Sequence, residues 1–115
     1  MKRYIKSGKL YDYTYYPFLD TREYNKFLWF INTEAKQYGL SVKYYDSKDP
    51  NDLGGENRSK SNAVWVYDSQ GTEIAYFVIQ ATKSDLIIDY DNKSSYFESF
   101  ADAEVYVTDI FESVA

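Results

Sequence analysis

The sequence contains neither histidine nor cysteine. Without cysteine there are no disulfide bonds, thiolate nucleophiles or iron–sulfur ligands, and without histidine the side chain that normally titrates near neutral pH is missing. The two absences also remove most ligand sets for zinc, copper and haem. Most familiar catalytic arrangements are therefore excluded, and we expect no cofactor.

Long apolar segments are missing as well. The longest strictly apolar run covers residues 27–31, and no apolar stretch follows the basic residues at the start of the chain. A membrane-spanning helix needs about 20 apolar residues, and a signal peptide needs an apolar segment after its basic one. The sequence therefore predicts a soluble cytoplasmic protein with no membrane association.

Recognisable catalytic motifs are also lacking. The chain has no P-loop, GxSxG or dinucleotide fingerprint, and Gly54-Gly55 follows no junction between a strand and a helix. Acidic residues in the polar segment 47–62 and just before it are spaced by three, three and four positions, which does not fit a calcium-binding EF-hand loop: Asp46, Asp49, Asp52 and Glu56. We predict neither an enzyme nor a metal site.

Charge is present in quantity but is unevenly distributed, and the formal net charge is -5. Residues 1–9 carry only basic charges, on Lys2, Arg3, Lys6 and Lys9. Residues 85–115 carry one base, Lys93, against the acids Asp85, Asp89, Asp91, Glu98, Asp102, Glu104, Asp109 and Glu112. Nucleic-acid binding normally needs a basic stripe that releases counterions. We therefore expect no direct nucleic-acid binding.

Aromatic residues make up 20% of the chain, with 14 Tyr, 7 Phe and 2 Trp. One core of this size cannot easily bury all of these rings, so we expect several tyrosines on the surface. Exposed tyrosine is enriched in protein interfaces. The alternative is that tyrosine fills strand positions, where its propensity is high.

Periodicity along the chain predicts alternating strands and helices. We expect strands at 10–16, 40–46, 63–67, 72–80 and 86–90, a helix between Asp20 and Gly39, and a last helix over 96–114. The short links between the later strands favour antiparallel pairing. The predicted fold is therefore α+β: a mainly antiparallel sheet of four to five strands, with a helix from the N-terminal half and a C-terminal helix packed on it. It forms a single domain over 1–115, with a basic N-terminal arm at 1–9 and a long mobile polar loop at 47–62.

Local signals mark several element ends. Asp20 followed by Glu23 resembles a capping box at the start of the first helix, and Gly39 ends that helix. The pair Ser95 and Glu98 predicts a second capping box, and residues 68–71 predict a type I turn. Trp29 and Phe30 lie off the apolar stripe of the first helix. Either that helix is sandwiched between two layers, or these rings meet a partner.

The last helix carries the predicted partner-binding residues. Its apolar residues fall within roughly 100° of arc and should face the core: Phe100, Ala103, Val107, Ile110, Phe111 and Val114. Its acids Glu98, Asp102, Asp109 and Glu112 fall within about 80° on the opposite side, about 6, 10 and 4.5 Å apart along the axis. These separations are comparable with phosphate spacings in one nucleic-acid strand. Asp85 and Asp89, expected on one strand face, and Tyr106 complete the set. The alternative is a solvated face that maintains solubility.

These features predict a small acidic, non-enzymatic module that binds a protein with a basic groove. Its sharper form is an inhibitor that imitates nucleic acid and blocks a DNA-handling enzyme. In size, charge and tyrosine content the chain resembles the anti-restriction and anti-CRISPR proteins of phages and mobile elements. One alternative is a self-assembling structural protein of phage or cell that buries Trp29, Phe30 and its tyrosine strands against copies of itself. A second alternative is a carbohydrate-binding domain in which Trp29, Trp65 and tyrosines stack on sugar.

Overall fold

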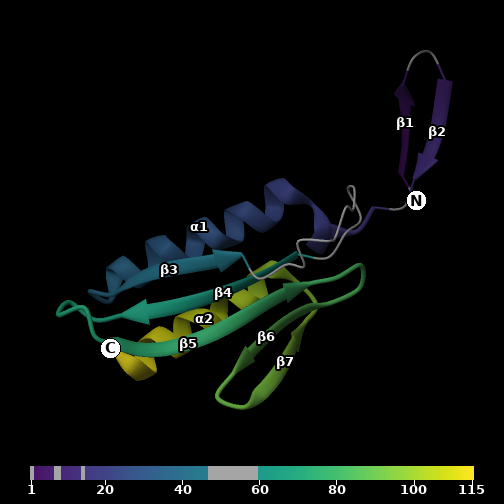
Figure 1. Cartoon of the computed structure of the whole chain (residues 1–115). Coiled ribbons are helices and arrows are strands. Elements are labelled where there is room, and N and C mark those ends of the chain that lie inside the picture. Colours follow the sequence, from purple (N-terminus) through teal and green to yellow (C-terminus); the bar gives the residue numbers. More distant parts are fainter. Residues whose placement is uncertain (1, 7–8, 14, 47–59) are drawn as a thin grey trace.

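The computed structural model describes the backbone of residues 2–6, 9–13, 15–46 and 60–115, and the side chains of residues 15–45 and 60–115. The elements follow one another along the chain as shown in Figure 1: β1 (Lys2–Lys6), β2 (Lys9–Tyr13), the 3-10 turn η1 (Pro17–Leu19), α1 (Thr21–Gln37), β3 (Ser41–Asp46), β4 (Lys60–Tyr67), β5 (Glu73–Ala81), β6 (Leu86–Tyr90), β7 (Lys93–Phe97) and α2 (Phe100–Val114).

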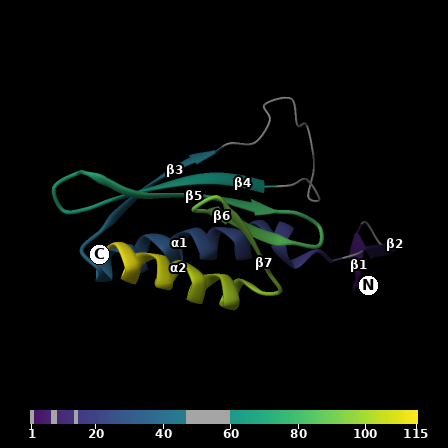
Figure 2. The ribbon, with the colours of Figure 1, turned by 90° about the horizontal axis from the view of Figure 1, so that it is seen from below.

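The main sheet has five antiparallel strands in the order β3-β4-β5-β6-β7, so each strand pairs with its neighbour in sequence. Figure 2 shows α1 and α2 side by side on one face of this sheet. The predicted α+β fold, with an antiparallel sheet and two helices packed on it, is confirmed. Neither helix in the described part of the chain is long and apolar enough to cross a membrane.

The core lies between the sheet and the two helices. Strand β5 alternates cleanly, because Ala75, Phe77, Ile79 and Ala81 are buried while the residues between them face the other side. The helices run parallel: Phe27 of α1 lies 5.5 Å from Phe100 at the start of α2, and Tyr38 lies 6.4 Å from Phe111 near its end, measured between ring centroids. The predicted apolar stripe of α2 therefore faces the core, as expected.

Helix α1 begins and ends at the predicted residues. One carboxylate oxygen of Asp20 accepts hydrogen bonds from the backbone N–H groups of Arg22 and Glu23, at 3.0 and 3.2 Å. The other oxygen accepts from the Tyr15 hydroxyl at 2.9 Å, and this bond is the largest cause of the lowered pKa of Asp20. After the last turn, Gly39 adopts a φ of 72°, a left-handed conformation that favours glycine.

The predicted start of the last helix is wrong by four residues. Residues 93–97 form strand β7, which pairs with β6 through a tight turn at Asp91 and Asn92. Both turn residues have positive φ, at 54° and 61°, as a type I′ hairpin requires, and Asp and Asn tolerate this conformation. The capping box at Ser95 and Glu98 is therefore absent. The N-cap is Ser99, whose hydroxyl accepts from the Asp102 N–H at 3.1 Å.

Other element predictions are met in part. The strand expected at 10–16 is present as β2 over Lys9–Tyr13, and it pairs with β1 in a separate two-stranded sheet. Residues 2–6 of the expected basic arm are thus a strand, while positions 7–8 and 14 lie outside the described residues. Most of the expected loop 47–62, with Asp49, Asp52 and Glu56, also lies outside them, and 60–62 belong to β4.

The turn at 68–71 is confirmed, because the Gly71 N–H donates to the Asp68 carbonyl at 3.1 Å. Trp29 contradicts a sandwiched helix: its side chain is 69% exposed, although Phe30 packs against the core. The reason is that both helices share one layer, which leaves the side of α1 away from the sheet open to solvent in the described structure (Figure 2).

Candidate protein-binding surfaces

One side of α2 is exposed and acidic. Asp102, Val105, Asp109 and Glu112 all lie in solvent, and by the helical period they share an arc of about 80° opposite the buried stripe. We call these four residues the α2 outer face. Val105, which is 63% exposed, adds an apolar contact between the carboxylates. The exposure expected for Asp102, Asp109 and Glu112 is therefore found.

Glu98 and Tyr106 do not join this face in the way the sequence suggested. Glu98 is exposed but precedes the N-cap, so it stands in the connection between β7 and α2 and not on the helix. Tyr106 is half-buried on the side of α2 toward β7, where its ring lies 5.2 Å from the Phe97 ring. Its ring therefore contributes to packing between α2 and β7.

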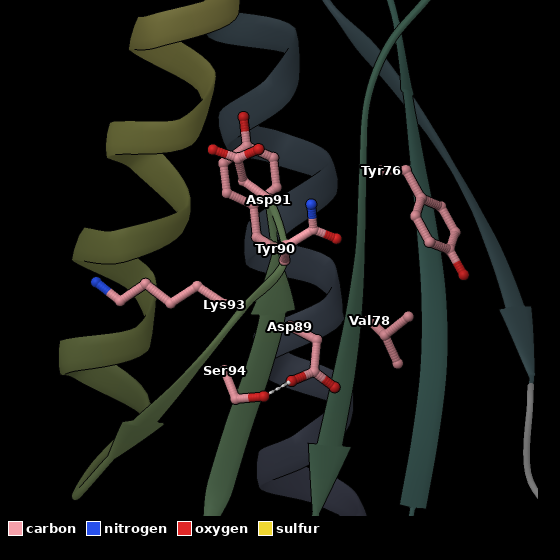
Figure 3. A pocket seen from close by; sticks show the side chains of 8 residues that line it. Tyr76, Val78, Asp89, Tyr90, Asp91, Lys93 and Ser94 are labelled. Carbon is pink, nitrogen blue, oxygen red and sulfur yellow. Dashed lines mark hydrogen bonds between the residues drawn. The ribbon is translucent and has the colours of Figure 1, made fainter.

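Asp85 and Asp89 are also separated from the α2 outer face. Asp85 closes the connection before β6: its carbonyl accepts from the Thr82 N–H at 2.8 Å and its carboxylate accepts from the Ser84 hydroxyl at 3.1 Å. Asp89 projects from β6 on the side of the sheet away from the helices and accepts a hydrogen bond from the Ser94 hydroxyl (Figure 3). The predicted acidic set is thus divided between two sides of the molecule.

Further carboxylates gather where α2 meets α1. Partial burial raises the pKa of Glu104, and the charge of Glu34 on α1 raises it further. At the far end of the helices, the Tyr38 hydroxyl donates to Glu112 at 2.8 Å. This bond raises the pKa of Tyr38, with smaller effects from the charges of Glu34 and Asp109. The acidic region therefore extends from the α2 outer face onto α1.

Glu34 and Glu104 also contribute to the acidic region, although neither was predicted to. Each residue borders the apolar stripe of its own helix, Glu34 three positions after Ile31 and Glu104 four positions after Phe100. That position is the available signal, because residues flanking a buried stripe face whatever packs beside the helix. Which helix lies there is set by tertiary structure. The parallel pairing of α1 and α2 is what brings the two carboxylates together.

The carboxylates of α2 form no ion pair with a lysine or arginine whose side chain is described. Across the residues whose side chains are described, the ion pair found is between Lys26 and Glu23 of α1, at 3.4 Å. No lysine or arginine of that part of the chain is therefore in an ion pair with a carboxylate of α2. Uncompensated carboxylates on a solvent-exposed helix attract a cationic surface and repel nucleic acid.

A second surface lies on the side of the main sheet that the helices leave uncovered. We call it the open sheet face. Its side chains alternate along each strand with those that face the core, and they include Lys43, Tyr45, Trp65, Tyr67, Tyr76, Val78, Gln80, Ile87, Asp89, Ser94 and Tyr96. Ala63 lies on the same side but is buried. The expectation of exposed tyrosines is confirmed here: Tyr45 is 64% exposed, Tyr76 45% and Tyr96 67%.

Three of these rings form a continuous cluster across β3, β4 and β5. The centroids of Tyr45 and Trp65 are 6.1 Å apart with the rings nearly perpendicular, and those of Trp65 and Tyr76 are 5.0 Å apart. Lys43 lies at the edge of the cluster, with its Nζ 5.4 Å from the centroid of the Tyr67 ring. This combination of rings and one cation is typical of contact surfaces.

Beside the cluster, a shallow hollow of about 580 Å³ opens next to the turn between β6 and β7 (Figure 3). Its walls combine the Tyr76 ring and Val78 with the polar groups of Asp89, Asp91 and Ser94. A ring next to carboxylate and hydroxyl groups is suited to neutral polar ligands, so a carbohydrate-binding role stays a prediction. Lys93 also lines the hollow, but its side chain extends toward α2 and away from Tyr76 (Figure 3).

In comparisons with known proteins, no family model matches the chain, and no curated protein or solved structure matches it either. Charge and exposure are thus the guides to function. The α2 outer face and the open sheet face point away from each other, because the core lies between the helices and the sheet (Figure 2).

Proposed function

We propose that this protein is a small acidic, non-enzymatic binding module that inserts the α2 outer face into a basic groove of another protein. In its specific form, the module imitates nucleic acid and inhibits a DNA-handling enzyme. The observation that carries the proposal is the set of exposed carboxylates on α2, Asp102, Asp109 and Glu112, which are held outward by a fully buried stripe on the opposite side of the same helix.

The spacing of these carboxylates supports imitation of a phosphate backbone. At 1.5 Å per residue, Asp102 and Asp109 are about 10 Å apart along the axis and Asp109 and Glu112 about 4.5 Å. Phosphates along one DNA strand recur about every 3.4 Å along the helix axis, so both separations span a small number of phosphate steps. Glu34 and Glu104 widen the negative region beside α2.

A rigid acidic helix also favours fast association. The field of clustered carboxylates steers a protein toward a cationic groove, and both the rate and the affinity fall as ionic strength rises. Val105 offers an apolar contact once the groove has been reached. Anti-restriction and anti-CRISPR inhibitors provide the analogy of size, charge and tyrosine content, and an intracellular target of that kind places this module in the cytoplasm.

The test measures displacement of a fluorescent DNA duplex from a panel of purified restriction endonucleases and RNA-guided nucleases. We expect the wild-type protein to release the duplex from at least one enzyme, less effectively as salt is raised. The double variant D109K/E112K should compete about tenfold less well or worse, because like charges then meet in the groove.

The matched control is the double variant E73K/D89K, which changes the net charge by the same amount at positions off the α2 outer face. Glu73 is exposed at the start of β5, and Asp89 lies on the open sheet face. This control should compete as well as the wild type. If no enzyme in the panel releases its duplex, or if both double variants lose the same activity, the α2 outer face is not the inhibitory surface.

A further inference from the structure

We infer that the open sheet face is the interface of a symmetric homodimer, in which the same face of a second copy packs against it. The inference is independent of the proposed function, since the α2 outer face lies on the other side of the core. Its first support is the cluster of Tyr45, Trp65 and Tyr76, in which the Tyr45 and Tyr76 rings are exposed on either side of the half-buried Trp65. Contiguous exposed rings of this kind mark interaction sites in soluble proteins.

The choice of a second copy as the partner rests on charge complementarity. The strand register places Lys43, Trp65 and Tyr76 in one row across β3, β4 and β5. Asp91, in the turn directly after Tyr90, lines the same hollow as Tyr76 and so lies at the β6 end of this row. The row therefore has a cation at one end, rings in the middle and a carboxylate at the other end, with Asp89 close by on β6.

Such a row is complementary to its own reverse. A twofold axis parallel to the strands and midway between β4 and β5 reverses the row in the facing copy. Trp65 then lies against the partner's Tyr76, and Lys43 lies against the partner's Asp91. The contacts of a twofold interface occur twice, so each favourable pair counts double.

The neighbouring row agrees with the same axis. It contains Tyr45, Ala63, Val78 and Asp89 in register across four strands. Reversal places the partner's Val78 over the already buried Ala63 and directs the Tyr45 hydroxyl toward the partner's Asp89. Sheets packed face to face lie about 10 Å apart with strands about 30° from parallel, which these side chains can fill.

The size of the surface sets the expected affinity. Four strands spaced about 4.8 Å apart and about six residues long give a patch of roughly 20 by 20 Å. The two copies together then contribute about 800 Å², which is less than the roughly 1,200 Å² of a stable interface, so association should be weak and should depend on concentration. Sedimentation velocity across about two decades of protein concentration therefore covers the transition.

The first experiment compares two exposed aromatic residues on different surfaces. We expect the wild-type sedimentation coefficient to rise with concentration to that of a dimer. The variant Tyr76→Ala should weaken the dimer about tenfold or more, because it removes a central ring. The control Trp29→Ala removes a 69% exposed ring from α1 and should leave the dimer unchanged. Circular dichroism checks that both variants retain the fold.

The second experiment tests the axis itself by exchanging charges. On its own, K43E should dimerise less than the wild type because a carboxylate at position 43 then faces the partner's Asp91. On its own, D89K/D91N should also dimerise less, because Lys43 loses its acidic partner and meets a second cation. Asparagine is chosen at position 91 because it tolerates the positive φ there. An equimolar mixture should form heterodimers and sediment faster than either variant at the same total concentration.

Three results would overturn the inference. The wild-type protein could remain a monomer over the whole concentration range, which would overturn the inference even if the open sheet face binds a different ligand. It could form a dimer that Tyr76→Ala leaves intact, which would place the interface elsewhere. Finally, the mixture of charge variants could associate no better than its separate components, which would exclude the proposed pairing of Lys43 with the Asp89 and Asp91 end.

Discussion

Exchanging valine for alanine at two positions of α2 tests which side of this helix is buried, a point on which the proposed function depends. Val107 is completely buried in the core, whereas Val105 is 63% exposed on the α2 outer face. The substitution is chemically identical at both positions and lies in the middle of the same helix. The gain in helix propensity from alanine, at most about 0.6 kcal/mol, therefore cancels when the two variants are compared.

The difference between the two variants follows from burial. Each substitution removes two methyl groups, worth about 0.8 kcal/mol each when fully buried, and at position 107 an unfilled cavity adds to the loss. We expect the free energy of unfolding of Val107→Ala to be about 2 kcal/mol lower than that of Val105→Ala. For a domain of this size, that is a difference in melting temperature of about 8 °C.

Urea unfolding followed by tryptophan fluorescence measures this difference, since Trp65 packs between the rings of Tyr45 and Tyr76. Equal slopes of the unfolding transitions would show that the denatured states are comparable. If both variants lost the same free energy of unfolding, or if Val105→Ala were the less stable variant, α2 would be rotated about its axis. The carboxylates of Asp109 and Glu112 would then not face solvent as a set.

Three further predictions concern local stability. Asp20→Ala should lower the free energy of unfolding by about 1 kcal/mol through loss of the N-cap, and Asp20→Asn by less, because its amide oxygen still caps. The lowered pKa of Asp20 makes its contribution complete above the ordinary value of 3.8 and lost as pH falls through the folded-state pKa. The stability difference between wild type and Asp20→Asn should therefore be constant above that value and shrink in acid. Gly39→Ala should cost about 1–2 kcal/mol in thermal unfolding, all of it from the φ of 72°, since no atom lies within 4 Å of an added Cβ. Glu104→Gln should raise the urea midpoint at neutral pH, because the raised pKa of Glu104 means that its ionisation destabilises the fold. The gain should vanish in acid below the ordinary pKa of 4.5, where the carboxyl group is protonated in both states. An equal gain at both pH values would contradict the role of its charge.

The elements that could be predicted from sequence are those fixed by local chemistry. Asp20 and Gly39 supply a cap and a left-handed residue that act within a single turn, so α1 has its expected ends. Asp68 and Gly71 do the same for the hairpin of β4 and β5. Strand β7 could not be recognised because Ser95 and Glu98 match a helix start. The sequence signal for the hairpin is the pair Asp91 and Asn92, two residues that tolerate the positive φ angles of the preceding turn.

The candidate surfaces also combine features set by local sequence with features that depend on tertiary structure. The exposed acids of α2 follow from the period of one helix and could be anticipated, whereas the approach of Glu34 to Glu104 depends on how two helices pack. The period of two along each strand predicts that the Trp65 and Tyr76 side chains lie on the side of the sheet opposite the core. Their alignment with Lys43 depends on strand register, which non-local pairing and the β-bulge after Val66 determine.

The two proposals combine into one arrangement that can be checked. In a dimer joined through the open sheet faces, the sheets lie at the centre and both helical layers lie outside, so two α2 outer faces point in opposite directions. One groove can then engage only one of them, and affinity for a single groove should be the same for wild type and Tyr76→Ala. A target with two linked grooves would instead bind the dimer with avidity, because the second contact becomes intramolecular. Comparing Tyr76→Ala with D109K/E112K on the same target thus separates loss of valency from loss of the contact itself.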